Sequence, residues 1–154
     1  MIDSPVVLSI EARKTAHIHL TIPRSQIQHV MGPALQELMS TLAAQGITPA
    51  GPWFTHHVAM SPDTFDFEVS VPVAADVQRA GRVVPGVQRA AKVARTIYHG
   101  PYEGLGDAWG QFMGALAALG LKTAPDLWET YLTSPHDGSD PATWQTELTR
   151  PLVE

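Results

Sequence analysis

The chain has 154 residues, of which 44% are hydrophobic and 16% charged, values typical of one globular domain with one core. Ten Lys and Arg against fifteen Asp and Glu leave a net charge of −5, which argues against general binding to nucleic-acid phosphates. Because cysteine is absent, disulfides, thiolate metal sites and a cysteine nucleophile are excluded.

The sequence also lacks the patterns of export, membrane insertion and nucleotide binding. The first eleven residues have no basic and apolar regions of a signal peptide, and no apolar run approaches 18 residues. Neither a GxGxxG motif nor a P-loop is present. We therefore expect a cytoplasmic protein with no membrane contact and no cofactor.

The first predicted elements are a strand and a helix. Apolar residues alternate along Thr15–Ile22, which indicates a half-buried strand, and Pro23 ends it. Ser25 and Gln28 have the spacing of a capping box that starts a helix. Apolar residues then recur at helical spacing as far as Gly46, which suits the position just after a helix C-terminus.

A proline interrupts this helical pattern. Pro33 would clash with the carbonyl group of His29, so we expect either a kink or a helix that starts at Pro33 itself. Two strands are predicted next, near Trp53–Ala59 and Phe65–Val71. The segment Ala74–Val87 is rich in glycine and proline and is predicted to be a connecting loop.

The second half of the chain repeats the same order of elements. A strand over Ala91–Tyr98 leads into a helix near Tyr102–Leu119, which Gly120 ends. Two further strands are predicted near Leu127–Thr133 and Thr143–Arg150.

The halves also match residue by residue, which indicates an internal duplication. Three matches occur in the same order, and the first has five identities in nine positions: Leu38–Gly46 with Phe112–Gly120 at an offset of 74, Trp53 with Trp128 at 75, and Glu68–Pro72 with Glu147–Pro151 at 79. The chain is therefore predicted to be a single domain, 1–154, with repeats at about 9–73 and 87–152. The expected fold class is α+β, with duplicated β-α-β-β units about a pseudo-twofold axis, an antiparallel sheet, helices on one side and a central cleft.

The copies differ where a polar site is predicted. When the copies are aligned on Trp53 and Trp128, Glu129 stands at the position of Phe54, and Tyr131 stands at the position of His56. Alternation along the strand puts Glu129 and Tyr131 on one face. Such a carboxylate can attract a cationic ligand, act as a general base or acid beside a tyrosine, or simply be an exposed glutamate on a sheet surface.

Three stretches carry a resemblance to a known family. Thr96–Tyr102, Trp128–Leu132, and Trp144–Leu148 with Pro151 and Leu152 resemble the GyrI-like small-molecule-binding domains, which are also the effector-binding domains of AraC-type and MerR-type regulators. The resemblance extends from about Ser9 to Leu152. It implies a duplicated β-α-β-β fold, in agreement with the repeat.

The resemblance also implies a function. Family members bind amphipathic, often cationic aromatic compounds in a central cleft, with a glutamate that Glu129 matches. Some stand-alone members resemble hydrolases that open cyclopropane rings of DNA-alkylating natural products with a Glu and a Tyr. For that Tyr, Tyr98, Tyr102 and Tyr131 all remain candidates.

The leading hypothesis is a stand-alone binding protein for amphipathic, cationic or polyaromatic small molecules. The predicted ligand-binding residues are Glu129, Tyr131, Tyr98, Tyr102, Trp53, Phe54, His56 and Trp109. The alternative is a hydrolase of strained electrophilic rings, in which Glu129 with Tyr98 or Tyr131 would be catalytic.

The sequence also bears on DNA and protein partners. There is no room for a helix-turn-helix domain before Ser9 or after Leu152, so direct DNA binding is not expected. Five of the ten basic residues lie in Arg79–Arg95, which predicts either a solvated surface or a contact of a protein-interaction module that protects a target enzyme.

The histidines do not form a metal-binding motif. His17 and His19 alternate on one strand, and His56 and His57 are adjacent on another. No HxxxH or His/carboxylate helical spacing accompanies them. We therefore predict no metal site.

Overall fold

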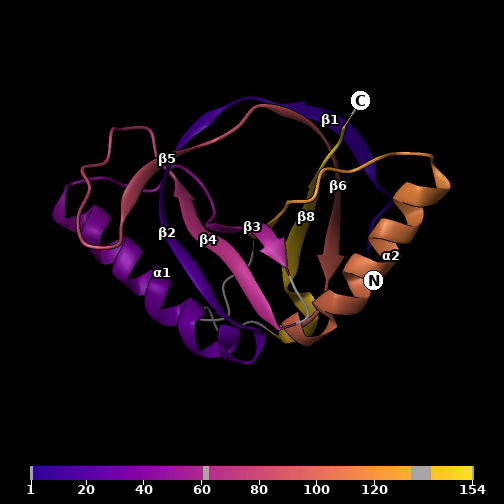
Figure 1. The fold of residues 1–154 in the computed structure, drawn as a ribbon, viewed down its shortest axis with the longest axis horizontal. Coiled ribbons are helices and arrows are strands. Elements are labelled where there is room, and N and C mark those ends of the chain that lie inside the picture. Colours follow the sequence, from indigo (N-terminus) through magenta and orange to yellow (C-terminus); the bar gives the residue numbers. More distant parts are fainter. Residues whose placement is uncertain (1, 61–62, 133–139, 154) are drawn as a thin grey trace. The chain divides into compact units, whose positions relative to one another are not determined.

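The chain folds into two compact units, which are described separately. The computed structural model describes residues 2–60, 63–132 and 140–153. Glu11–Ala90 make up the first unit, and Met1–Ile10 together with Ala91–Glu154 make up the second. The fold class is α+β with antiparallel strand pairs, as predicted (Figure 1).

Each unit has four paired strands and one long helix. The elements of the first unit are β2 (Arg13–Pro23), the short 3-10 helix η1 (Arg24–Gln26), α1 (Ile27–Ala44), β3 (Phe54–Met60), β4 (Thr64–Pro72) and β5 (Val84–Gln88). Those of the second are β1 (Val6–Ile10), β6 (Ala91–His99), η2 (Tyr102–Gly104), α2 (Leu105–Ala118), β7 (Leu127–Tyr131), η4 (Pro141–Thr143) and β8 (Gln145–Pro151). The strand orders are β3-β4-β2-β5 and β7-β8-β6-β1, so the repeats pair their strands alike.

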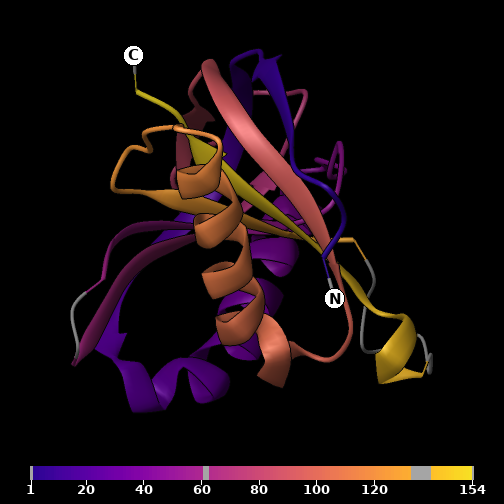
Figure 2. The same ribbon diagram turned by 90° about the vertical axis from the view of Figure 1, so that its right-hand side faces the viewer.

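In both units the core lies between the helix and one face of the sheet. Figure 1 shows α1 along β2 and β4, and Figure 2 shows α2 against β6 and β8. The helix residues that are almost fully buried are equivalent in the two copies: Ala34, Leu38 and Leu42 in α1, and Ala108, Phe112 and Leu116 in α2. Their common offset of 74 confirms the predicted helix match.

The edge strands were not predicted. The structure forms β5 within the segment that was predicted as a loop, and β5 pairs with β2, placing Gly86 opposite Thr15. Pro85 and Gly86 weaken the strand pattern in the sequence, but an edge strand tolerates a proline because its outer side needs no ladder hydrogen bond. The strand β1, which pairs with β6 in the second unit, was also missed.

The start of α1 differs from the prediction, whereas the helix ends agree with it. The N-cap of α1 is Gln26, without a side-chain capping bond, so the predicted capping box of Ser25 is wrong. Pro33 lies inside α1, so the helix does not start there. Gly46 and Gly120 have φ of 71° and 73°, the left-handed conformation expected after a helix end. Within the described ranges, no helix has the length and apolarity needed to cross a bilayer.

Candidate functional site

Glu129 faces the helix side of the second unit. It lies opposite Leu148 in the pairing of β7 with β8, and Leu148 belongs to the core beneath α2. Residues opposite each other in a ladder share a face of the sheet. The Trp109 Nε1–H of α2 donates a hydrogen bond to Glu129 Oε2 at 2.6 Å, and the Tyr131 hydroxyl donates one to Glu129 Oε1 at 2.9 Å. Each carboxylate oxygen is thus held by a neutral donor.

Aromatic rings adjoin this carboxylate. The Tyr102 ring lies edge-on to Tyr131 at 5.7 Å and tilted against Trp144 at 4.9 Å between centroids. Burial, and then the negative charge of Glu129, raise the pKa of Tyr102 above its ordinary value. Glu129, Tyr131, Tyr102 and Trp109, all predicted from the sequence, therefore come together in one unit. Trp144 was not predicted as a site residue, although it belongs to a family-like stretch.

Tyr98, the remaining predicted tyrosine, has a different environment. It is 6% exposed and belongs to the core of the second unit. Its hydroxyl donates a hydrogen bond to the Pro101 carbonyl oxygen at 2.8 Å. Tyr131, by contrast, is hydrogen-bonded to Glu129.

A buried threonine lies between two of these tyrosines. Thr146 pairs with Tyr98 on one side and with Tyr131 on the other. Its hydroxyl is buried and has no hydrogen-bond partner within the described residues. A water molecule or a ligand can supply that bond.

The sheet registers correct the alignment of the two copies. Val69 and Leu148 are equivalent at the offset of 79, and they lie opposite Thr55 and Glu129. The counterpart of Glu129 is therefore Thr55 and not Phe54, and the sequence alignment of these strands was one residue out. The second copy still carries the carboxylate, but it replaces a buried threonine.

The other predicted site residues belong to the first unit. Trp53 packs against the core of that unit. Phe54 is 2% exposed, and the guanidinium of Arg13 lies 5.2 Å from its ring centroid. His56 lies opposite Glu68, on the face of the sheet that α1 does not cover.

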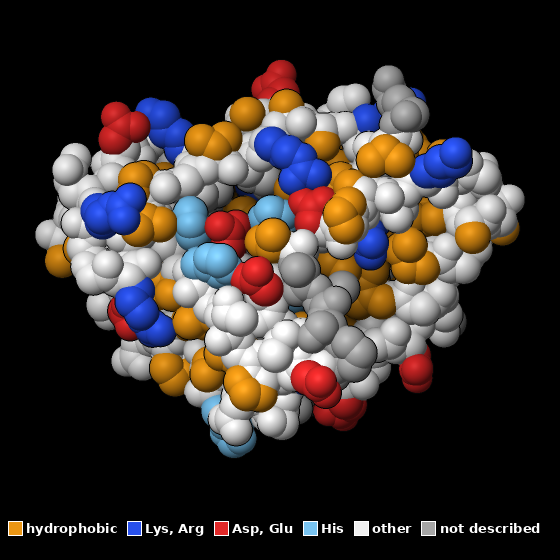
Figure 3. Space-filling view, in the orientation of Figure 1, with side chains coloured by type: hydrophobic (Ala, Val, Ile, Leu, Met, Phe, Trp, Pro, Cys, Tyr) orange, Lys and Arg blue, Asp and Glu red, His pale blue; other side chains and the backbone are white. Residues whose placement is uncertain are grey.

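That face carries a group of histidines and carboxylates, which Figure 3 shows gathered at the surface. Glu68 bridges two histidines, with Oε1 2.9 Å from His56 Nδ1 and Oε2 3.2 Å from His17 Nε2, and His19 pairs with Asp66. The His56 hydrogen bond is the main cause of the lowered pKa of Glu68, whereas burial lowers the pKa of His17. Sequence reasoning weighed the histidines but missed Glu68, although alternation on both strands puts it on the same face.

This group does not have the arrangement of a metal site. In the described part of the chain, no set of three or more His, Asp or Glu side chains is placed to hold a metal ion. The two Glu68 oxygens instead face different imidazoles.

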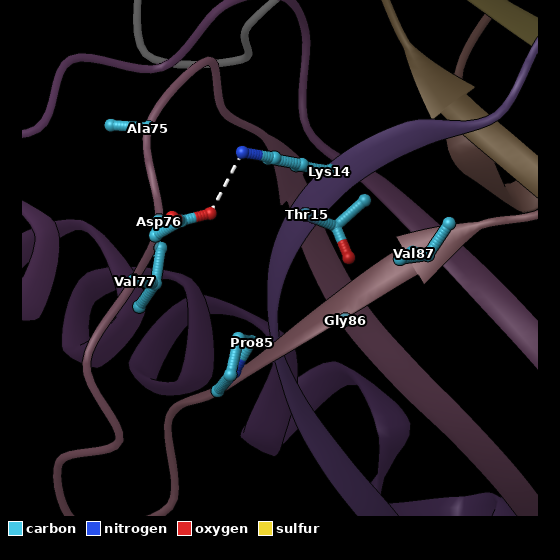
Figure 4. Close-up of a pocket in the computed structure, with 8 residues that line it drawn as sticks. All are labelled: Lys14, Thr15, Ala75, Asp76, Val77, Pro85, Gly86 and Val87. Carbon is cyan, nitrogen blue, oxygen red and sulfur yellow. Dashed lines mark hydrogen bonds and ion pairs between the residues drawn. The ribbon is translucent and has the colours of Figure 1, made fainter.

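A pocket of about 270 Å³ also opens in the first unit (Figure 4). An ion pair of 2.7 Å joins Lys14 Nζ to Asp76 Oδ1 beside it, and both side chains are exposed. The lining residues are Lys14, Thr15, Ala75, Asp76, Val77, Pro85, Gly86 and Val87. None of these was a predicted site residue, and the paired charges leave little net charge to select a ligand.

The basic segment Arg79–Arg95 forms ion pairs within the chain. Arg82 Nη2 lies 2.8 Å from Glu37 Oε1, and Arg95 Nε lies 3.2 Å from Glu147 Oε1. These two positive charges are matched by carboxylates among the described residues, which favours the surface interpretation over a docking contact.

The fold is similar to solved structures at low sequence identity. The C-terminal domain of EcmrR gives a TM-score of 0.84 at 21% identity, with 97% of each chain covered. In the longer EcmrR chain of a DNA complex, this chain spans 58% of the length. A hydrolase from Listeria innocua gives 0.69 at 13% identity, covering 97% of this chain and 92% of that one. SAV2435, solved bound to tetraphenylphosphonium, gives 0.67 at 10% identity, covering 97% and 93%.

These identities show a shared fold and nothing about a shared ligand. No curated protein sequence matches the chain. The model of the GyrI-like small molecule binding domain matches residues 4–153. The chain therefore belongs to the family of GyrI-like small-molecule-binding domains.

Proposed function

We propose that the chain binds amphipathic, cationic or polyaromatic small molecules through Glu129 and the aromatic side chains beside it. The observation that carries this proposal is the pair of neutral donors, Trp109 and Tyr131, on the two carboxylate oxygens. These hydrogen bonds orient the carboxylate without cancelling its charge. A cation with aromatic substituents can gain both a charge interaction and contacts with ring faces there.

Tetraphenylphosphonium is a suitable probe, because SAV2435 has this fold and was solved bound to it. Isothermal titration calorimetry of the wild type and Glu129→Gln would test the role of the charge. Since Gln keeps the shape and an acceptor oxygen, we expect affinity to fall about tenfold, equivalent to about 1.4 kcal/mol.

Two controls separate charge at the site from other effects. Triphenylphosphine oxide, a neutral aromatic probe, should lose little affinity in Glu129→Gln. Glu11→Gln removes the same charge from an exposed side chain of the other unit and should leave tetraphenylphosphonium binding nearly unchanged. Equal affinity of wild type and Glu129→Gln for the cation would remove Glu129 from the proposal.

A hydrolase of strained electrophilic rings is the second candidate function. It is favoured by the Tyr131–Glu129 hydrogen bond, which joins a carboxylate base to a phenol. Glu129 would take a proton from a water molecule while the oxygen atom of that water attacks a cyclopropane carbon. The breaking C–C bond would deliver its electron pair to a conjugated carbonyl, and the resulting enolate would take the proton back from Glu129, which restores the carboxylate. The Tyr131 hydroxyl, which donates to Glu129 Oε1, would orient this base.

Turnover decides between the two functions. The protein would be mixed with a tenfold excess of a carbonyl-conjugated cyclopropane, and ring opening would be followed by chromatography. An enzyme converts the whole excess and loses this activity in Glu129→Gln. Protection of no more than one equivalent leaves binding as the function.

A further inference from the structure

The junction between β6 and α2 is tied at one carbonyl group. The Pro101 carbonyl oxygen accepts hydrogen bonds from the Tyr98 hydroxyl at 2.8 Å and from the Gly104 amide at 3.1 Å. The Gly100 amide donates to the Trp144 carbonyl oxygen at 2.9 Å. These bonds define the path of the backbone that carries Tyr102.

Two glycines make room for the Tyr98 hydroxyl. A Cβ atom on Gly104 would overlap this hydroxyl, and one on Gly100 would lie 2.7 Å from it. Gly100 also has φ of 145°, which side chains with a Cβ rarely adopt. The turn is thus built closely around the end of the tyrosine side chain.

The first copy folds without this arrangement. Leu20 lies opposite Phe67, and Tyr98 lies opposite Thr146, which is the equivalent of Phe67 in the second copy. Leu20 therefore occupies the position of Tyr98, and it has no hydroxyl group. Leu20 and Tyr98 are 78 residues apart, and at this offset Gly100 and Gly104 correspond to Ile22 and Gln26.

The turn nevertheless has the same partners in both copies. Arg24 lies over Phe65 at 4.4 Å, as its equivalent Tyr102 lies against Trp144. The repeat therefore needs neither the hydroxyl nor the glycines in order to form. They occur in the copy that carries Glu129.

We propose that Tyr98 is a positioning residue, whose hydroxyl holds the turn so that Tyr102 packs against Tyr131 beside Glu129. This inference rests on the proposed function of that site. The hydroxyl acts through the Pro101 carbonyl, and the side chain that it places is Tyr102. The acceptor of the Tyr98 hydroxyl is the Pro101 carbonyl oxygen and not the carboxylate.

The test uses Tyr98→Phe, which keeps the buried ring and removes the donor. The chain has three tyrosines, so ¹³Cζ-tyrosine NMR can follow the ionisation of each without ligand. If Tyr98 positions Tyr102, the pKa of Tyr102 should fall toward its ordinary value in the variant. The reason is that the Tyr102 ring would become more exposed to solvent and would move away from Glu129. Tetraphenylphosphonium affinity should also fall about fivefold, as expected for one lost hydrogen bond.

Thr96→Val is the matched control in the same strand. It removes another buried hydroxyl donor, which bonds to the Asp3 carbonyl oxygen at 2.7 Å. It should lower stability without moving the titration of Tyr102. Gly104→Ala, which displaces the Tyr98 hydroxyl, should act in the same direction as Tyr98→Phe.

Two results would overturn the inference. One is an unchanged Tyr102 titration in Tyr98→Phe, and the other is an equal shift in Thr96→Val, which would mean general loosening. A wild type that fails to bind tetraphenylphosphonium would count against the proposed function instead, because the titration needs no ligand.

Discussion

Two glutamates, one in each unit, show how neighbouring side chains decide what a carboxylate can do. Glu68 lies between His17 and His56, whose imidazoles can match its charge when protonated. Glu129 accepts hydrogen bonds from an indole N–H and a phenol O–H, which are uncharged donors. These two hydrogen bonds orient the Glu129 carboxylate through uncharged donors, whereas the two contacts of Glu68 are with side chains that can become positively charged.

The indole donor can be removed without removing the aromatic ring. In Trp109→Phe, Glu129 loses the hydrogen bond at Oε2 but keeps an aromatic neighbour. We expect the free energy of unfolding to fall by about 1 kcal/mol, and cation affinity to fall less than in Glu129→Gln. Urea unfolding and calorimetry would measure both. A variant as weak in binding as Glu129→Gln would mean that orientation matters as much as charge.

The histidine group makes stability depend on pH. The pKa of His17 is lowered from its ordinary value of 6.5, so the unfolded chain binds the proton more readily. Stability is therefore present above pH 6.5 and is lost as pH falls through that value. The pKa of Glu68 is lowered from 4.5, which adds a further loss as pH falls below 4.5.

Urea unfolding at pH values from 8 to 4 would measure this dependence. In His17→Gln the slope between pH 7 and 5 should flatten. The control is His29→Gln, because His29 is exposed on α1. An equal slope in wild type and His17→Gln would show that His17 is not the group responsible.

At the scale of elements, the helices agreed with the sequence better than the strands at the edges. A helix can be recognised in a sequence because many apolar residues recur at helical spacing. Both helices are also followed by a glycine with positive φ. The strand β5 has few such positions and contains Pro85. Pairing with β2, which is far away in sequence, makes it a strand.

Two glycines, one inside α2 and one just after its end, give opposite predictions. Gly120 has φ of 73°, so Gly120→Ala should lower the free energy of unfolding by about 1 kcal/mol. Gly114 lies inside the helix with no atom near the site of a Cβ, so Gly114→Ala should raise it by about 0.5–1 kcal/mol. Chemical denaturation of both variants checks the signs, and a loss in both would contradict the helix boundary.

At the scale of the whole molecule, the repeats exchange their edge strands. The strand β1 precedes β2 in the chain but pairs with β6, and β5 precedes β6 but pairs with β2. Each unit is thus completed by a segment that comes directly before the other repeat. The predicted repeats, at about 9–73 and 87–152, are continuous stretches of sequence. They therefore could not show that each edge strand pairs with the other repeat.

Removing residues 2–10 should act on one unit more than the other. The strand β6 loses the ladder with β1, and Ile97 loses the hydrogen bond from the Asp3 amide. Hydrogen exchange followed by mass spectrometry should therefore show faster exchange in β6 and little change in β2. Equal acceleration in both strands would mean that the two units unfold as one.

The sequence alone determined the α+β class, the duplication, the C-terminal ends of both helices, and Tyr102, Trp109 and Tyr131 as neighbours of Glu129, but not Trp144. Those features follow from local periodicity and from side-chain types, which need no knowledge of the partner. The tertiary structure decided that Tyr131 and Trp109 hold Glu129, that Tyr98 bonds to Pro101, and that Thr55 is the counterpart of Glu129. These depend on strand register and on contacts between distant residues, and a shift of one position changes the face of every side chain.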